Sequence, residues 1–418
     1  MELDLTIVNE DGTNLPALDK GKFDGVAFDN QIGTLIIKDA DLTISGVKLN
    51  PLTGNYGIQA YILTLLAFNS DVRKSKLERL GWTDCNDPTN MNAFDPGAFR
   101  TRVAFTNLSA RFQVSAPIFI SPFMQTRYLL PMTPLQLTLT LAPEEIVLLT
   151  PEPPATKRYK YQLKRANFLI EKCCALESFQ LSLEKKLLSG ANANFLLPHF
   201  VTRSYHVAAG SSVFSLNDAF LNLFSPGNYQ FARLSVRPSA QPSLHPHVRP
   251  SVRPSVHEKC IFQKTVIIFS EYVIVGLTTQ AEAVGNQNLS VYNFRPHNLR
   301  SVEIISDGYT FPGIPLEINS NEYIRAWLSL FSGASEAGNF SNETTMIDRH
   351  RFANGFCLIR IDLTASKCHD TARPRIMSSC RVKLTFDSVT NPHLRLYLMT
   401  YSLEQFSLDA QRACLKSY

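Results

Sequence analysis

The sequence lacks the features that mark membrane, secreted and nucleic-acid-binding proteins. No apolar run is long enough to cross a bilayer, and residues 1–4 do not open a basic-then-apolar signal. The eight cysteines are scattered without a framework spacing, so reduced thiols are expected. The net charge of +5 on 418 residues is not gathered into a basic face. These absences predict an intracellular protein of the cytoplasm or nucleus that binds neither membranes nor specific nucleic acids.

Motifs for catalysis and metal binding are also missing. No Gly-rich phosphate loop precedes a helix, and no nucleophile elbow is present. Residues 368–370 read Cys-His-Asp, but side chains of neighbouring residues in a strand point to opposite faces, so we interpret them as a polar loop. Three further groups match no metal-site spacing: Cys173 with Cys174; His245 and His247 with Cys260; Asp84 and Asp87 with Asp95. The sequence therefore predicts neither an enzyme nor a bound cofactor.

The composition is that of a globular, aromatic-rich β protein. Hydrophobic residues make up 44% and charged residues 18% of the chain, which argues against general disorder. Phe (27) and Tyr (14) are abundant although there are only two Trp, a bias typical of strands. A chain of 418 residues has room for two domains, each with its own core.

One short phrase occurs twice, far apart in the chain. Residues 42–62 and 302–328 each read as a β-branched strand, a Gly turn, a second short strand and an amphipathic helix. The text that follows repeats as well, because residues 135–141 and 381–386 both alternate with period two. We therefore predict two related β domains in tandem, with short strands also at 34–37 and 146–149 and a helix at 179–188.

The repeated helices carry the candidate functional residues. The helix at 58–68 contains Tyr61 and Ile62, and the helix near 324–333 contains Trp327 and Leu330, with Tyr323 just before it. Tyr61 and Trp327 hold equivalent places, each after an alanine that lets its helix approach a neighbour. Two interpretations are open: these side chains anchor a helix on its own sheet, or they contribute to contacts between subunits.

A proline repeat interrupts the pattern of the second domain. From residue 235 to 257 a proline recurs at every fourth position, and two of these four-residue units read Ser-Val-Arg-Pro. Proline at this density removes backbone donors and blocks both helix and central strand. We expect a disordered insertion near residues 224–270.

Several stretches resemble the major capsid protein of Polinton (Maverick) elements, a double jelly-roll protein related to virophage and adenovirus-type capsid proteins. The matching text, in order and spacing, is RYLL at 127–130, SLNDAFL at 215–221, YNFRPHNL at 292–299, EYIRAWLSLFSG at 322–333, FANGF at 352–356 and IDLT at 361–364. The likeness covers nearly the whole chain except residues 224–270.

The resemblance implies an all-β fold of two tandem jelly-roll β-sandwiches with short inserted helices. The first jelly roll spans residues 1–155 and is expected to lack its opening strand, and the second spans 160–415. The implied function is that of a structural capsid subunit of a virus-like transposable element, which forms a homotrimer with pseudo-hexameric outline and meets a minor (penton) capsid protein. The alternatives are a ligand- or carbohydrate-binding β-sandwich module, or a decayed copy in a host genome that no longer assembles.

Overall fold

The computed structural model describes most of both halves of the chain. The described residues are 1–17, 25–50, 52–68, 71–72, 75–84, 91, 97–125, 127–151, 158–217, 219, 272–306, 308–318, 322–331, 345–363 and 380–417. Four groups of residues discussed above lie outside these ranges: the proline repeat; the Cys-His-Asp triplet at 368–370; His245, His247 and Cys260; and the acids Asp87 and Asp95.

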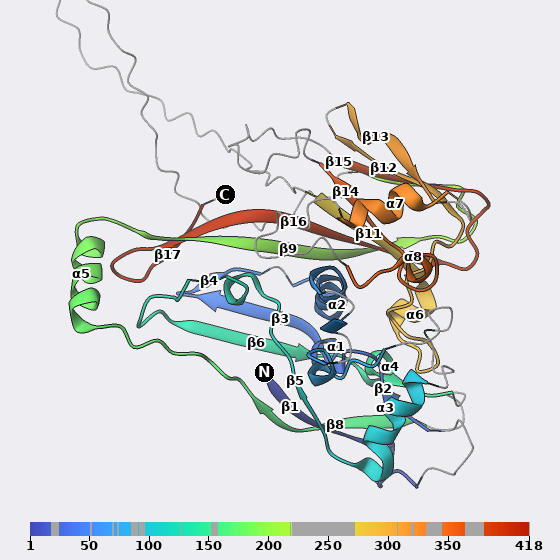
Figure 1. Ribbon diagram of the computed structural model, residues 1–418, viewed down its shortest axis with the longest axis horizontal. Coiled ribbons are helices and arrows are strands. Elements are labelled where there is room, and N and C mark those ends of the chain that lie inside the picture. The colour runs from blue at the N-terminus through green and yellow to red at the C-terminus, as the bar shows by residue number, and fades with distance from the viewer. Residues whose placement is uncertain are drawn as a thin grey trace, which may run out of the picture.

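The second half of the chain forms a sandwich of two antiparallel sheets (Figure 1). In one sheet the strands lie in the order β10 (Val213–Leu216), β15 (Cys380–Phe386), β12 (Leu299–Ser306) and β13 (Tyr309–Glu317). In the other the order is β14 (Leu358–Asp362), β11 (Tyr272–Thr279), β16 (Leu394–Leu408) and β9 (Ala193–Val207), with β17 (Cys414–Ser417) on the end of β16. Eight strands in two sheets of this order make a complete jelly roll.

The first half repeats most of this arrangement. One sheet has the order β4 (Val47–Lys48), β3 (Ile37–Ile44), β6 (Leu135–Leu141), and another has β5 (Phe112–Ser115), β1 (Glu2–Asn9), β8 (Tyr159–Asn167). A short pair, β2 (Ala27–Phe28) with β7 (Leu148–Leu149), forms a separate two-stranded sheet.

The chain order of the two halves matches strand by strand. β1, β3, β4, β5, β6 and β8 take the places of β11, β12, β13, β14, β15 and β16, with the same neighbours in the sheets. A helix follows the second of the hairpin strands in both halves, α2 (Tyr56–Ala67) in the first and α7 (Ile324–Leu328) in the second. Within the described residues of the first half, no strand takes the places of β9 and β10. The fold is thus a double jelly roll, and six strands of the described first copy have counterparts in the second.

Short helices occupy the connections between strands. They are α1 (Ile32–Leu35), α3 (Ala98–Thr106), α4 (Glu144–Val147), α5 (Glu177–Leu188), α6 (Gln280–Val284), α8 (Arg349–Ala353), and the 3₁₀ turns η2 (Glu78–Leu80), η3 (Asn107–Ser109), η4 (Ser121–Phe123) and η5 (Ser329–Phe331). α6 begins with a capping box, in which Thr279 and Glu282 satisfy each other's backbone amides. Among the helices in the described ranges, none is long and apolar enough to span a membrane.

Two strand predictions are wrong in part. Residues 34 and 35 belong to α1 rather than to a strand, and only Ile37 begins β3. Residues 146 and 147 end α4, which leaves two residues for β7. Two acids after Pro143 favour a helix start, because carboxylates stabilise the positive end of the helix dipole. The predicted helix at 179–188 is confirmed as α5.

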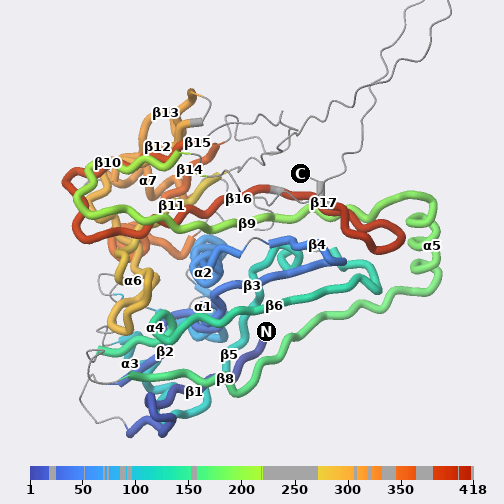
Figure 2. Tube along the Cα trace, turned by 180° about the vertical axis from the view of Figure 1, so that it is seen from behind, coloured from blue at the N-terminus to red at the C-terminus, as the bar shows by residue number. Residues whose placement is uncertain are grey.

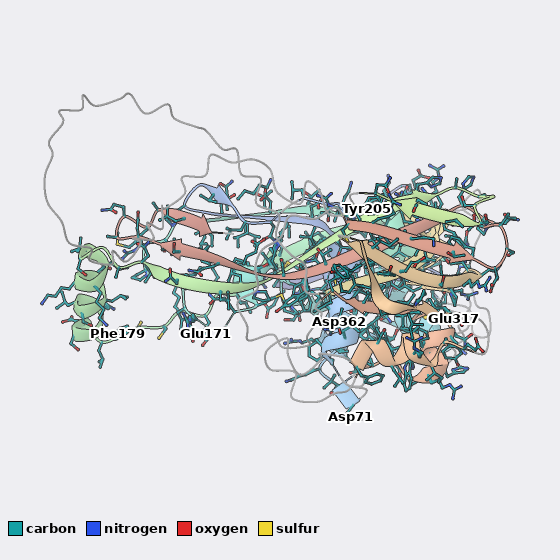
Figure 3. All side chains as sticks on the ribbon, turned by 90° about the horizontal axis from the view of Figure 1, so that it is seen from above. Asp71, Glu171, Phe179, Tyr205, Glu317 and Asp362 are labelled. Carbon is teal, nitrogen blue, oxygen red and sulfur yellow. The ribbon has the colours of Figure 1, made fainter. Side chains whose placement is uncertain are left out.

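Both jelly rolls share one continuous hydrophobic core. The largest fully buried side chains come from both halves and include Trp82, Tyr61, Tyr292, Phe294 and Phe352. α2 lies between the two jelly rolls, whereas α5 stands at one end of the molecule (Figure 2). Figure 3 shows Phe179 of α5 and Glu171 at the opposite end of the molecule from Glu317 of β13.

Candidate functional site: two equivalent helices

α2 is buried on nearly every side. Its sequence, YGIQAYILTLLA, carries apolar residues on more than one face, and nine of its twelve residues are buried. Tyr61 is 0% and Ile62 is 1% exposed, and Ala60 is 0% exposed. A helix that is apolar all round is stable only where elements cover it from several directions. α2 therefore needs a neighbour besides its own sheet.

The second jelly roll is that neighbour. The Tyr61 ring stacks on Tyr292 with centroids 3.7 Å apart, and Phe294 lies 6.4 Å away. The backbone N–H of Met346 and the hydroxyl of Thr345 both donate to the carbonyl of Leu65, each at 3.1 Å. α2 thus joins the two jelly rolls through its apolar face and through its last turn.

A polar cluster beside α2 completes this junction. The Ser290 hydroxyl donates to Asp29 Oδ2 at 2.8 Å, and Asn288 Nδ2 donates to the carbonyl of Thr150 at 2.7 Å. Burial raises the pKa of the Asp29 carboxyl, and the Arg102 guanidinium acts in the opposite direction. A buried carboxyl that accepts hydrogen bonds from both halves holds the loop after α6 in place against the first jelly roll.

α7 is held on its own sandwich by three local contacts. The Trp327 Nε1–H donates to the carbonyl of Ile347 at 3.0 Å, and its ring meets Phe331 edge-on at 5.0 Å. Tyr323 stacks on Phe352 with centroids 5.7 Å apart. Leu330, in η5, is 3% exposed. The structure thus brings Tyr323, Trp327 and Leu330 together around one short helix.

The two helices differ on the face that α2 turns to the second jelly roll. The repeated phrase aligns Ala60 with Ala326, Tyr61 with Trp327, and Ile62 with Leu328. Both alanines are 0% exposed. Ile62 is 1% exposed whereas Leu328 is 50% exposed, and Trp327 is only partly buried. Two positions that are fully buried in α2 are therefore half exposed (Leu328) or only partly buried (Trp327) in α7.

The other residues considered from sequence form no catalytic centre in the described part. Cys173 and Cys174 are free, exposed thiols between β8 and α5. Asp84 Oδ1 lies 2.9 Å from Arg351 Nη2 in an ion pair between the two halves. The structure also shows a buried histidine–carboxylate pair that was not named above: His199 Nδ1 lies 2.7 Å from Glu404 Oε1 inside the β9–β16 pair. No group of three or more metal-ligating side chains occurs in the ranges that the structure describes.

Sequence reasoning missed Leu328 and the ring partner of Tyr61. Leu328 could have been found, because it aligns with Ile62 in the repeated phrase. The stacking of Tyr292 on Tyr61 joins residues 231 positions apart in the chain, and no local pattern signals such a contact.

Solved structures of viral capsids share this fold. A chain of the 3.5 Å cryo-EM structure of the Sputnik virophage aligns with a TM-score of 0.51 and 10% identity, over 100% of this chain and 81% of that one. The mavirus major capsid protein gives 0.43 and 11%, over 100% and 82% of the two chains. The Faustovirus major capsid protein gives 0.43 and 8%, over 97% and 77%. No family model and no curated protein matches the chain. At 10% identity the Sputnik alignment supports a shared fold and nothing more.

Proposed function

We propose that this chain is a structural major capsid protein subunit that assembles as a trimer with pseudo-hexameric outline. The sequence resemblance supports the shell of a Polinton (Maverick) type element, assembled in the cytoplasm or nucleus. The partners are further copies of the chain and a minor (penton) capsid protein. The role is structural rather than enzymatic, and it needs no cofactor.

The difference between α2 and α7 carries this proposal. Within one chain, α2 of the first jelly roll packs on the second. If the second jelly roll meets the first jelly roll of the next chain in the same way, α7 takes the place of α2 and buries Leu328 and Trp327. A heterologous contact of this kind closes into a ring when the rotation fits. Six similar domains then form a ring from three chains.

The test is the oligomeric state of the purified protein and of a variant at Leu328. Analytical ultracentrifugation should give a mass of three chains, and negative-stain electron microscopy should show a six-lobed ring. Leu328→Asp places a charge on the α7 face and should yield monomers that remain folded. Leu52→Asp is the matched control, because Leu52 is a leucine of nearly the same exposure, 51% against 50%, in the first jelly roll.

Two outcomes would contradict the proposal. If the wild-type chain is monomeric at all accessible concentrations, the proposed trimer is refuted. If Leu328→Asp leaves the trimer intact, or if Leu52→Asp disrupts it equally, the proposed role of α7 in the interface is refuted.

A further inference from the structure

The segment between β8 and α5 carries two adjacent thiols. This segment, residues 168–176, belongs to no helix or strand and links the first jelly roll to the second. Cys173 and Cys174 are both exposed. Three further cysteines in the described ranges are buried: Cys357, Cys380 and Cys414. Among the described thiols, the adjacent pair is therefore the one that a reagent in solution reaches first.

The linker is held in place on both sides of the thiols. The Tyr128 hydroxyl donates to Glu171 Oε1 at 3.0 Å, and the pKa of Tyr128 is raised by Glu171 and, to a smaller extent, by Cys173. Cys173 thus lies close to this hydrogen bond. Beyond the thiols, Glu184 of α5 forms an ion pair with Arg412. Figure 3 shows Glu171 at the end of the molecule that carries α5.

No backbone hydrogen bond holds the chain at the thiols themselves. Among the backbone hydrogen bonds between described residues, none involves residues 168–174. Neighbouring side chains point to opposite sides of an extended chain, so the two thiols come together only if backbone bonds rotate. Such a rotation breaks no backbone hydrogen bond between described residues.

The spacing of the two cysteines decides how their sulfurs can be joined. Consecutive Cα atoms lie about 3.8 Å apart, whereas the Cα atoms of a relaxed disulfide lie about 4.4–6.8 Å apart. A direct disulfide between the two would therefore be strained and easily reduced. An atom bound to both sulfurs enlarges the ring by one member and lets the sulfurs stand further apart than the about 2.05 Å of a disulfide. The pair thus favours a bridging atom over a direct bond.

The surroundings of the pair decide which bridging atom fits. Thiolates select soft ions, but a structural zinc ion takes four protein ligands. In the ranges that the structure describes, no three such side chains are placed to hold a metal ion. Trivalent arsenic that carries one organic substituent needs only two sulfurs. Ile170 is 62% and Leu176 is 78% exposed, and these apolar side chains near the pair suit an aryl substituent.

We propose that Cys173 and Cys174 form a chelating site for soft, thiophilic centres of the trivalent organoarsenical class. An arsenoxide R–As=O reacts with both thiols to give one dithioarsenite ring and one molecule of water. Two As–S bonds form, and two S–H bonds and the As=O bond break. The two thiol protons leave with the oxygen as water, and arsenic stays trivalent. The site lies within one chain, so it is independent of the proposed assembly.

Phenylarsine oxide is the probe for this site. The protein is the full chain with Cys85, Cys260 and Cys368 replaced by serine, so that thiols outside the described ranges do not contribute. Intact-mass spectrometry should show one phenylarsenic group per chain, which resists washing with a monothiol and is removed by a small dithiol. The second As–S bond forms at high effective concentration, and such chelation strengthens binding about 10²–10⁴-fold.

Serine variants locate the site. Cys173→Ser and Cys174→Ser should each weaken binding by about 10²-fold or more, because only one As–S bond remains. Cys414→Ser is the matched control, because it removes a buried thiol, and it should leave binding unchanged. Circular dichroism of each variant checks that the fold is retained.

Three results would overturn the proposal. The first is the absence of monothiol-resistant arsenic on the parent protein. The second is equal retention of arsenic by the parent and by both linker variants. The third is arsenic that joins two chains, seen as a species of twice the chain mass, which would show that each chain supplies a single thiol.

Discussion

Tyr61 and Trp327 hold equivalent positions, yet their replacement by alanine should affect different properties. Tyr61 is fully buried between the jelly rolls, and truncation of a buried aromatic side chain costs about 3–5 kcal/mol. Stacking on Tyr292 stabilises the fold further, since an aromatic pair contributes about 0.5–1.5 kcal/mol beyond the effect of buried surface area. We expect Tyr61→Ala to lower the free energy of unfolding of the single chain by about 4 kcal/mol.

Trp327 should contribute less to the single chain and more to the trimer. Its side chain is partly buried, and its indole N–H donates a hydrogen bond to the carbonyl of Ile347, which contributes about 1 kcal/mol. We expect Trp327→Ala to cost about 2 kcal/mol in the chain, below the range for a fully buried ring. In addition, if the chain assembles as proposed, Trp327→Ala should raise the concentration at which trimers dissociate, because the proposed interface would bury the rest of the ring.

Denaturant unfolding followed by circular dichroism measures the first effect, and ultracentrifugation over a concentration series measures the second. Unfolding is measured in the Leu328→Asp background, so that association does not add to the apparent stability. Equal losses of chain stability for Tyr61→Ala and Trp327→Ala, with trimer dissociation unchanged, would refute the reasoning. α7 would then be an anchor of its own sandwich and nothing more.

Two further predictions concern the second jelly roll. Burial, with the nearby Arg295 charge, lowers the pKa of His297 to about 4. The unfolded chain, with a histidine pKa of about 6.5, therefore takes up the proton first as the pH falls. We expect the free energy of unfolding to drop by about 3 kcal/mol between pH 6.5 and pH 4. Denaturation at several pH values should show that His297→Asn removes this loss and that His350→Asn keeps it. Gly276→Ala should cost about 1–3 kcal/mol, because its Cβ would lie 2.8 Å from Phe294 Cδ1, whereas Gly313→Ala, with no atom within 4 Å, should leave the melting temperature nearly unchanged. Equal effects of the two alanines would contradict the close packing at β11.

The sequence alone determined the local units and their repetition. The repeated phrase predicted the hairpin and helix that became β3, β4 and α2, and again β12, β13 and α7. Period-two alternation predicted β6 and β15. These features depend on contacts between residues close in sequence or on which face of a strand is apolar. Both properties follow directly from the amino-acid sequence.

Only the tertiary structure decided which of the repeated units are covered. Ile62 and Leu328 occupy the same place in the same phrase, yet one is buried and the other half exposed. The leucines of β6 alternate as regularly as the apolar residues of β15, yet Leu135 and Leu141 are exposed. Periodicity shows which face of an element is apolar, but coverage depends on a neighbour from a distant part of the chain. The different exposure of Ile62 and Leu328 depends on such neighbours, and for that reason it emerged only from comparison of the two halves in space.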